Sequence, residues 1–280
     1  MRTVGVLGCG LMGSGIAQVC AQSGYRTIVR EVDRALVDRG LGRIESFLAA
    51  GVERGKVTPE ARDATLANLS GTTDVADLAA ADIVVEAIVE DLDAKREMFA
   101  ALDAVVGENT LFASNTSSLC ITEMASATRR PDRFLGLHFF SPVPVMKLVE
   151  VIRGLATSDD TYRRGMEFAT SLGKQPVTAP DRPGFIVNRL LIPYLLDAIR
   201  AYESGVGTLE DIDKGMALGC GHPMGPFTLL DFVGLDTTYY IANIMYDEFR
   251  DPAYAAPPLL KRMVAAGRLG RKTGRGFYVY

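Results

Sequence analysis

The chain contains 280 residues, of which 48% are hydrophobic and 23% are charged, with a formal net charge of -4 at pH 7. The length favours two domains, the composition is that of a folded globular protein, and the mild acidity gives no general reason to expect nucleic acid as a partner. No apolar run approaches the length of a membrane span and no signal-peptide pattern opens the chain, so we predict no membrane association and a cytoplasmic protein.

The cysteines stand far apart in the sequence, at Cys9, Cys20, Cys120 and Cys220, and none forms a CxxC pair. Isolated cysteines in a chain of this length do not indicate a disulfide framework. We therefore predict reduced thiols that serve mostly as small core residues, and no metal site.

The amino-terminal residues alternate strand and helix patterns. Residues 3–7 predict a short apolar strand, residues 11–23 a helix that ends at Gly24, and residues 25–30 a second strand. Together these elements form a βαβ unit, the building block of a parallel sheet.

A helical excursion over about residues 34–68 follows this unit. Its first helix covers residues 34–54, and Thr58 with Pro59 marks the start of a second helix, because a capping hydroxyl precedes a proline in the first turn. Further along, strands are predicted at residues 81–86, 110–114, 134–138, 147–151 and 175–179, and a helix at residues 91–105. The alternation predicts an α/β fold, a Rossmann-type doubly wound and mainly parallel sheet, in a domain of residues 1–183.

Residues 184–280 carry helical periodicity and predict a smaller all-helical domain. Its predicted helices cover residues 185–204, 209–218, 237–249 and 259–266. Pro193 falls inside the first of them and predicts a kink there or a break near Leu191. Segments such as residues 227–233 carry more apolar side chains than a domain of this size needs, so we predict a homodimer formed through this domain.

The turn after the first strand carries a glycine motif, Gly8-Cys9-Gly10-Leu11-Met12-Gly13. The first glycine permits the tight turn, the second lets the backbone approach a pyrophosphate, and the third allows close helix packing, with the phosphates at the positive helix end. A carboxylate at Glu31, where the second strand ends, accepts ribose hydroxyls and favours NAD. Arg30 leaves NADP as a secondary alternative, although adjacent strand residues point to opposite faces. A glycine turn that binds no cofactor is the remaining alternative.

His138 is one of two histidines in the chain and stands at the end of a predicted strand. After a turn stiffened by Pro142 and Pro144, the next predicted strand carries Glu150, so neighbouring strand ends can bring the carboxylate beside the imidazole. A carboxylate at one ring nitrogen fixes the tautomer and stabilises the imidazolium, which leaves the other nitrogen to exchange a proton. The alternative is a half-buried histidine whose ring bonds a backbone carbonyl.

Six ordered motifs resemble the 3-hydroxyacyl-CoA dehydrogenase family, most closely its short bacterial 3-hydroxybutyryl-CoA dehydrogenases. The motifs are residues 8–13, 113–119, 136–151, 183–189, 222–226 and 270–278. The resemblance covers essentially the whole chain. It implies hydride transfer between NAD and the C3 carbon of an acyl-CoA substrate.

The resemblance implies a role for each matching residue. His138 would be the general base for the 3-hydroxyl, and Glu150 would orient it. Ser117 would hydrogen-bond the substrate near the reacting oxygen and the nicotinamide ribose, and Asn188 would position substrate and base. Outside the motif context, Ser117 would be a cap or turn residue and Asn188 an exposed helical residue.

Further cofactor contacts are implied for Glu90, Lys95 and Lys272, although Glu90 and Lys95 alone suggest a solvated pair at a helix start. Ser141 departs from the family, which usually has asparagine there on the nicotinamide side of the cofactor. A serine hydroxyl can still donate a hydrogen bond, or a water can fill the gap. His222 lies between Gly221 and Pro223, a setting that predicts a structural role.

Coenzyme A carries phosphates, and the family meets them with basic residues after the second strand. Arg54 and Lys56 are the candidates, with a solvated helix end as the alternative reading, and Ala50 stands where the family often has lysine. We expect the acyl-CoA in a cleft between the domains.

Alternative functions remain open at this stage. A dehydrogenase of free hydroxyacids would resemble families with a lysine-based site, and the set of His138, Glu150 and Asn188 disfavours it. A sugar-acid dehydrogenase closer to the hydroxyacyl-CoA family, and a non-catalytic NAD-binding protein, are the others.

Overall fold

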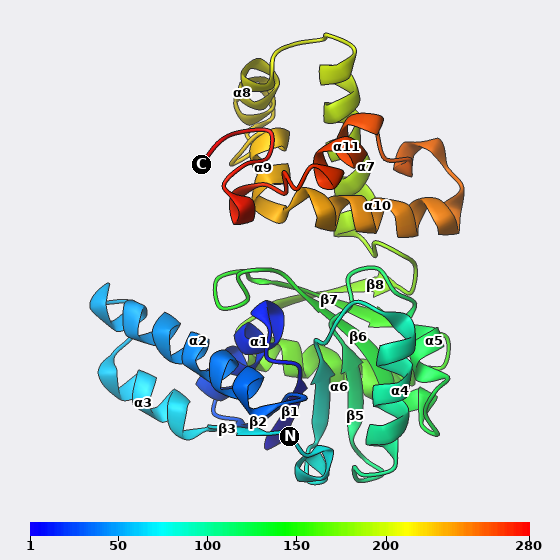
Figure 1. The fold of residues 1–280 in the computed structure, drawn as a ribbon. Coiled ribbons are helices and arrows are strands. Elements are labelled where there is room, and N and C mark those ends of the chain that lie inside the picture. Colours follow the sequence, from blue (N-terminus) through cyan, green and yellow to red (C-terminus); the bar gives the residue numbers. More distant parts are fainter. The chain divides into compact units, whose positions relative to one another are not determined.

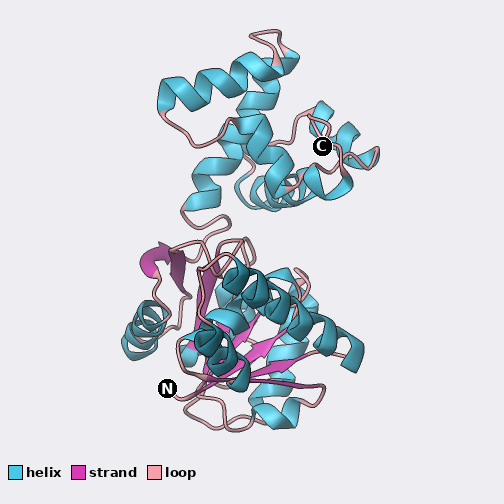
Figure 2. Ribbon diagram, turned by 90° about the vertical axis from the view of Figure 1, so that its left-hand side faces the viewer, coloured by secondary structure: helices cyan, strands magenta, loops and turns pink.

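The computed structural model describes all 280 residues, and the chain divides into two compact units, Met1–Asp181 and Arg182–Tyr280. The named strands all belong to the first unit, and helices and loops make up the second (Figure 2). No helix combines the length and the apolar character needed to cross a membrane.

The first unit is built on one eight-stranded sheet with the order β3-β2-β1-β4-β5-β6-β7-β8. Its strands are β1 (Thr3–Leu7), β2 (Arg26–Arg30), β3 (Leu69–Thr72), β4 (Ile83–Glu86), β5 (Leu111–Ser114), β6 (Phe134–Phe139), β7 (Leu148–Arg153) and β8 (Gln175–Pro180). All neighbours are parallel except β6 and β7, which are antiparallel. The predicted Rossmann-type, mainly parallel fold is confirmed. The strand order reverses between β1 and β4, and ligands of such sheets bind at the carboxyl ends of strands at this point.

Helices cover both faces of the sheet. In the first unit they are α1 (Leu11–Gln22), α2 (Arg34–Glu53), α3 (Pro59–Ala67), α4 (Leu92–Asp103), α5 (Ile121–Ala125) and α6 (Asp159–Ser171). Alternate residues of β5 divide between the faces: Leu111 joins the core cluster that includes α1 and α6, whereas the Phe112 ring packs against Phe99 of α4. Burial on both faces explains why β5 carries apolar side chains at successive positions.

Helices α2 and α3 lie side by side as a hairpin next to β3 (Figure 1). The predicted start of α3 is confirmed, because the Thr58 hydroxyl accepts a hydrogen bond from the Ala61 N–H and Pro59 is the first helical residue. Gly40 of α2 packs so closely on the glycine turn that a Cβ there would lie 2.1 Å from the Cys9 sulfur. The hairpin is therefore anchored directly on the turn that follows β1.

One strand and two α-helices of the first unit were not predicted from the sequence: β3, α5 and α6. Strand β3 has four residues, with a glycine and two hydroxyl side chains, so its pattern is weak. Helix α6 carries a start signal, since the Ser158 side chain accepts from the Thr161 N–H and two aspartates fill the first turn. That signal was available in the sequence.

The cysteine prediction holds in part. All four thiols are free, and Cys9 and Cys20 are buried as expected. Burial raises the pKa of both thiols, which keeps them in the uncharged form. Cys220, in contrast, is exposed, because it ends a helix whose surroundings face solvent.

The second unit consists of α7 (Val187–Glu203), α8 (Leu209–Cys220), α9 (Pro226–Val233), α10 (Leu235–Phe249) and α11 (Pro258–Ala265). Single turns of 3-10 helix complete the chain at Val75–Leu78, Pro131–Arg133, Pro252–Tyr254 and Arg271–Thr273. Helix α7 runs unbroken through Pro193, which excludes the alternative of a break near Leu191 and leaves the predicted kink as the other alternative. Buried Ile192 and Leu195 on either side anchor the helix in the core of this unit and outweigh the lost backbone hydrogen bond.

A buried carboxylate, Asp103, ties the end of α4 to the segment before β6. Asp103 is 4% exposed and accepts hydrogen bonds from the Arg129 N–H, the Arg129 Nε and the Arg130 Nε. Burial on its own raises the pKa of Asp103, but the hydrogen bonds from Arg129 and Arg130 outweigh it and hold the pKa below the ordinary value. The ionised form is therefore the one that stabilises the fold.

We predict that Asp103→Asn lowers the free energy of unfolding by about 3 kcal/mol at neutral pH, because two arginines lose their buried partner. Because the pKa of Asp103 is lower in the folded state than in the unfolded state, its ionised form stabilises the fold. This contribution is complete above the pKa of the unfolded state, about 4, and is lost as the pH falls through the pKa of the folded state. Urea unfolding at pH 7 and at pH 3 measures the difference, which should shrink at the lower pH. Asp63→Asn, which removes an exposed partner of Arg62, is the control and should change stability little. Equal stability of Asp103→Asn and wild type at pH 7 would contradict the prediction.

Candidate active site

The glycine turn joins β1 to α1 and contains three glycines with different surroundings. Gly8 has φ +87°, and a Cβ there would lie 2.5 Å from the Ala87 carbonyl oxygen. A Cβ on Gly13 would lie 1.9 Å from the Gly8 carbonyl oxygen, so α1 can start this close to the turn only without a side chain. At Gly10 a Cβ would meet nothing within 4 Å. This open space at the amino end of α1 fits the phosphates of a dinucleotide.

Glu31 lies directly beside this turn. Its Oε1 accepts a hydrogen bond of 2.6 Å from the Cys9 N–H, and its Oε2 accepts one of 3.2 Å from the Val32 N–H. A carboxylate retains further lone pairs, so ribose hydroxyls can still be accepted here. The Nε of Arg30 donates to the Thr73 carbonyl. The arrangement fits the adenosine ribose of NAD.

His138 and Glu150 face one another across β6 and β7. They are direct partners in the antiparallel register, and His138 Nδ1 lies 2.6 Å from Glu150 Oε2. His138 is 7% exposed and Glu150 is completely buried. The contact expected from the sequence is present, and it holds the imidazole by a charge-assisted hydrogen bond.

The end of β6 is held in place from the neighbouring strand. Asn115, which follows β5, accepts a hydrogen bond of 2.9 Å at its Oδ1 from the Phe139 N–H. The Phe140 ring packs against the imidazole of His138 with ring centroids 4.5 Å apart. Glu150 thus occupies the Nδ1 side of the His138 imidazole.

A buried polar network supports the loop that carries Ser117. The Lys95 ammonium is 1% exposed and contacts Glu86 Oε1 at 2.5 Å and Glu90 Oε2 at 3.1 Å. Glu90 Oε1 in turn accepts from the Thr116 hydroxyl at 2.5 Å and from the Ser117 N–H at 3.0 Å. The alternative of a solvated Glu90 and Lys95 pair is wrong. Lys95 of α4 is buried and forms its shortest ion pair with Glu86 of β4.

The turn that carries Ser141 is fixed by a lysine that the sequence did not single out. Ser141 is exposed, and just beyond it Lys174 Nζ donates to the carbonyls of Val143 at 2.5 Å and Met146 at 2.9 Å. Burial lowers the pKa of Lys174, and Lys147 adds to the effect. A Cβ on Gly15 of α1 would lie 2.8 Å from the Val143 Cβ. The turn is thus held between α1 and Lys174, a long-range contact with no local sequence signal.

The basic candidates for coenzyme A lie at the end of α2. Arg54 caps the helix and Lys56 follows it, both exposed. Arg54 stands fourteen residues beyond Gly40, about 21 Å along the helix from the glycine turn. The structure therefore does not bring these two residues to the turn, and their role stays a prediction.

Asn188 and Lys272 belong to the second unit, so their placement toward the residues of the first stays a prediction. Asn188 is partly buried in the first turn of α7. Lys272 is exposed and forms an ion pair of 2.6 Å with Asp236. The tail beyond it is fixed by buried Asp231, which accepts from the backbone N–H groups of Phe277 and Tyr278.

His222 lies in an exposed turn with its Nδ1 3.4 Å from the Tyr194 hydroxyl. The two rings also meet edge to face, with centroids 5.6 Å apart. Contacts of this kind fit the predicted structural role of His222 in the turn.

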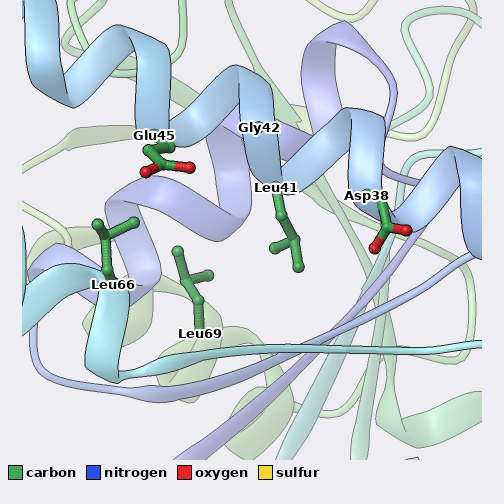
Figure 3. A pocket seen from close by; sticks show the side chains of 6 residues that line it. All are labelled: Asp38, Leu41, Gly42, Glu45, Leu66 and Leu69. Atoms are coloured by element: carbon green, nitrogen blue, oxygen red, sulfur yellow. The ribbon is translucent and has the colours of Figure 1, made fainter.

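A cavity of about 350 Å³ lies elsewhere in the first unit, between α2 and the end of α3 (Figure 3). Its lining consists of Asp38, Leu41, Gly42, Glu45, Leu66 and Leu69. Three leucines and two carboxylates offer nothing that attracts phosphate. Helical spacing also places this lining on a different face of α2 from Gly40, which contacts the glycine turn.

Comparison with protein families identifies both units. The model of the 3-hydroxyacyl-CoA dehydrogenase NAD-binding domain matches residues 3–182, and the model of the C-terminal domain of the same family matches residues 184–280. The two matches together span nearly the entire chain.

Individual relatives agree with the family match. A 3-hydroxybutyryl-CoA dehydrogenase of Mycobacterium tuberculosis is 52% identical over 282 residues, covering 100% of this chain and 99% of the relative. The human mitochondrial hydroxyacyl-coenzyme A dehydrogenase is 48% identical, with 100% of this chain and 91% of the relative covered. The crystal structure of Ralstonia eutropha (S)-3-hydroxybutyryl-CoA dehydrogenase PaaH1 is similar with a TM-score of 0.96 at 47% identity, covering 100% of this chain and 99% of that one.

We predict that Gly13→Ala abolishes NADH binding, because the added methyl collides with the Gly8 carbonyl and forces α1 away from the turn. Titration of NADH fluorescence measures the affinity, and circular dichroism confirms that the variant is folded. Gly42→Ala is the matched control, since a Cβ at Gly42 meets nothing within 4 Å and should leave NADH affinity unchanged. NADH binding of wild-type strength in folded Gly13→Ala would show that the turn is not the cofactor site.

Proposed function

Because the chain belongs to the 3-hydroxyacyl-CoA dehydrogenase family, we propose that it interconverts (S)-3-hydroxybutyryl-CoA and acetoacetyl-CoA with NAD as the hydride carrier. The family itself establishes an NAD-dependent dehydrogenase of 3-hydroxyacyl-CoA. The four-carbon substrate rests on the names of full-length relatives at 46% to 52% identity.

The observation that carries the proposal is the buried pair of His138 and Glu150. In the oxidative direction His138 Nε2 accepts the proton of the 3-hydroxyl as the C3–H bond breaks, and in the reductive direction it returns the proton to the carbonyl oxygen. NAD, when bound, would supply the hydride acceptor in the first case and, as NADH, the hydride donor in the second.

Glu150 acts through the imidazole. Its position at Nδ1 keeps the proton of the neutral ring on that nitrogen, so Nε2 is the basic atom that faces the reaction. When His138 becomes charged, the buried Glu150 carboxylate offsets the charge at short range. Proton uptake by His138 is thereby favoured at the moment when the 3-hydroxyl loses its proton.

Ser117 and Asn188 are proposed to position the substrate. The Ser117 N–H donates to Glu90 Oε1 at 3.0 Å, which fixes the backbone. The Ser117 hydroxyl lies 3.5 Å from the same oxygen, and we propose that it exchanges this long contact for a hydrogen bond to the reacting oxygen. Asn188 of the second unit would donate a hydrogen bond to the substrate or accept one from it. Arg54 and Lys56 would meet coenzyme A phosphates.

NAD rather than NADP is supported by Glu31, because a carboxylate at the ribose hydroxyls repels a 2′-phosphate. We propose that Glu90, Lys95, Ser141 and Lys272 contribute to the cofactor site. The Lys95 ammonium is enclosed by Glu86 and Glu90, so we propose that it acts on the cofactor through Glu90.

A homodimer through the second unit is also proposed. Large apolar side chains are exposed there, among them Leu190 at 71%, Leu218 at 76% and Phe232 at 47%. Exposed apolar side chains of this size on a unit of 99 residues are typical of a dimer interface.

We predict that His138→Gln slows NADH oxidation by acetoacetyl-CoA at least about 100-fold, because no other group supplies the proton. NADH affinity should stay within about two-fold of wild type, since His138 serves proton transfer. Steady-state kinetics at 25 °C with saturating substrates measures the rate. His222→Gln is the control and should retain the wild-type rate. A wild-type rate in His138→Gln would end the proposal.

We predict that Phe232→Glu converts a dimer into a monomer, because it places a charge in an apolar interface. Light scattering at micromolar concentration should give twice the 30.2 kDa chain mass for wild type and the chain mass for the variant. Leu155→Glu changes a side chain of the first unit that is 91% exposed and should leave the dimer intact. A monomeric wild type would refute the dimer.

A further inference from the structure

Arg43, on the third turn of α2, reaches across to the glycine turn. Its Nη1 donates to the Cys9 carbonyl at 3.1 Å and to the Ser14 hydroxyl at 3.4 Å. Cys9 precedes the open position at Gly10, and Ser14 lies in the first turns of α1. The guanidinium is therefore held against the start of the helix whose amino end faces the phosphate site.

The rest of this guanidinium is available to a ligand. Its two protein contacts both involve Nη1, and Nε and Nη2 donate to no atom of the chain. Arg43 is exposed and forms no ion pair, whereas Arg34 on the same helix is paired with Asp38 at 2.9 Å. The Nε–H and the two Nη2–H groups thus remain open beside the glycine turn.

The charge of Arg43 stands where the fold already concentrates positive potential. The amino end of α1 presents unpaired backbone N–H groups and the positive end of the helix dipole, and a cation beside it is repelled. The nearby carboxylate of Glu31 is held by the N–H groups of Cys9 and Val32. An anion seated between the helix end and Arg43 would relieve the repulsion, and a phosphate matches the fork of a guanidinium.

From this geometry we infer that Arg43 binds phosphate oxygens of a nucleotide ligand seated at the amino end of α1. NAD and coenzyme A both carry a pyrophosphate, and the position beside Gly10 favours that of NAD. The inference rests on the proposed function for the presence of these ligands. It adds a ligand-binding cation that the glycine motif does not include.

The test compares Arg43→Met, which keeps the aliphatic stem, with Arg43→Lys, which keeps the charge but loses the fork. NADH affinity is measured by fluorescence titration and coenzyme A affinity by calorimetry, each at low and high salt. We expect Arg43→Met to weaken NADH binding about ten-fold at low salt, the lower end for a hydrogen bond to a charged group, with a smaller loss at high salt. Arg43→Lys should recover part of the affinity. The maximal rate with saturating ligands should fall less than two-fold.

Arg39→Met is the matched control, because Arg39 is an exposed arginine on the same helix without an ion pair. A loss for coenzyme A rather than NADH would support the phosphate role and assign it to the substrate. Unchanged affinity for both ligands in Arg43→Met, or an equal loss in Arg39→Met, would overturn the inference. Wild-type protein that binds neither ligand would overturn the proposed function, and with it the basis of this inference.

Discussion

The whole arrangement depends on one antiparallel strand pair in a sheet that is otherwise parallel. Because β7 runs against β6, His138 and Glu150 stand directly opposite one another and on the same face. Backbone hydrogen bonds between β6 and β7 hold the two residues in this register, and β8 pairs with the other edge of β7. The register places the two side chains directly opposite each other, and their contact is 2.6 Å.

The parallel part of the sheet brings the remaining groups to the same edge. Strands β1, β4, β5 and β6 run in one direction, so the glycine turn, the Glu86 network, Ser117 and the end of β6 all follow carboxyl ends of neighbouring strands. The glycine turn and His138 at the end of β6 are therefore held by one sheet. The turn after His138 is tied back to the same scaffold through Lys174.

Much of this could be predicted because the signals are local. The glycine motif, the apolar strands and the capped start of α3 each lie within a few residues, and the His138 and Glu150 contact follows once two adjacent strands are assigned. The features that could not be predicted are those set by residues distant in the sequence. No residue next to Lys95 in the sequence reveals that Glu86 pairs with it, and nothing near Pro193 decides between the two predicted alternatives, a kink or a break.

The role of Glu150 offers the most direct test of the central claim, since it depends on the buried contact and not on the presence of a histidine alone. Single-turnover oxidation of 3-hydroxybutyryl-CoA by prebound NAD, followed as NADH formation in H2O and in D2O, isolates the chemical step. The account predicts that Glu150→Gln slows this step by at least about ten-fold in both solvents. It also predicts unchanged NAD affinity and a slower wild-type step in D2O, because the proton moves with the hydride. A single-turnover rate in Glu150→Gln equal to that of wild type would contradict the account.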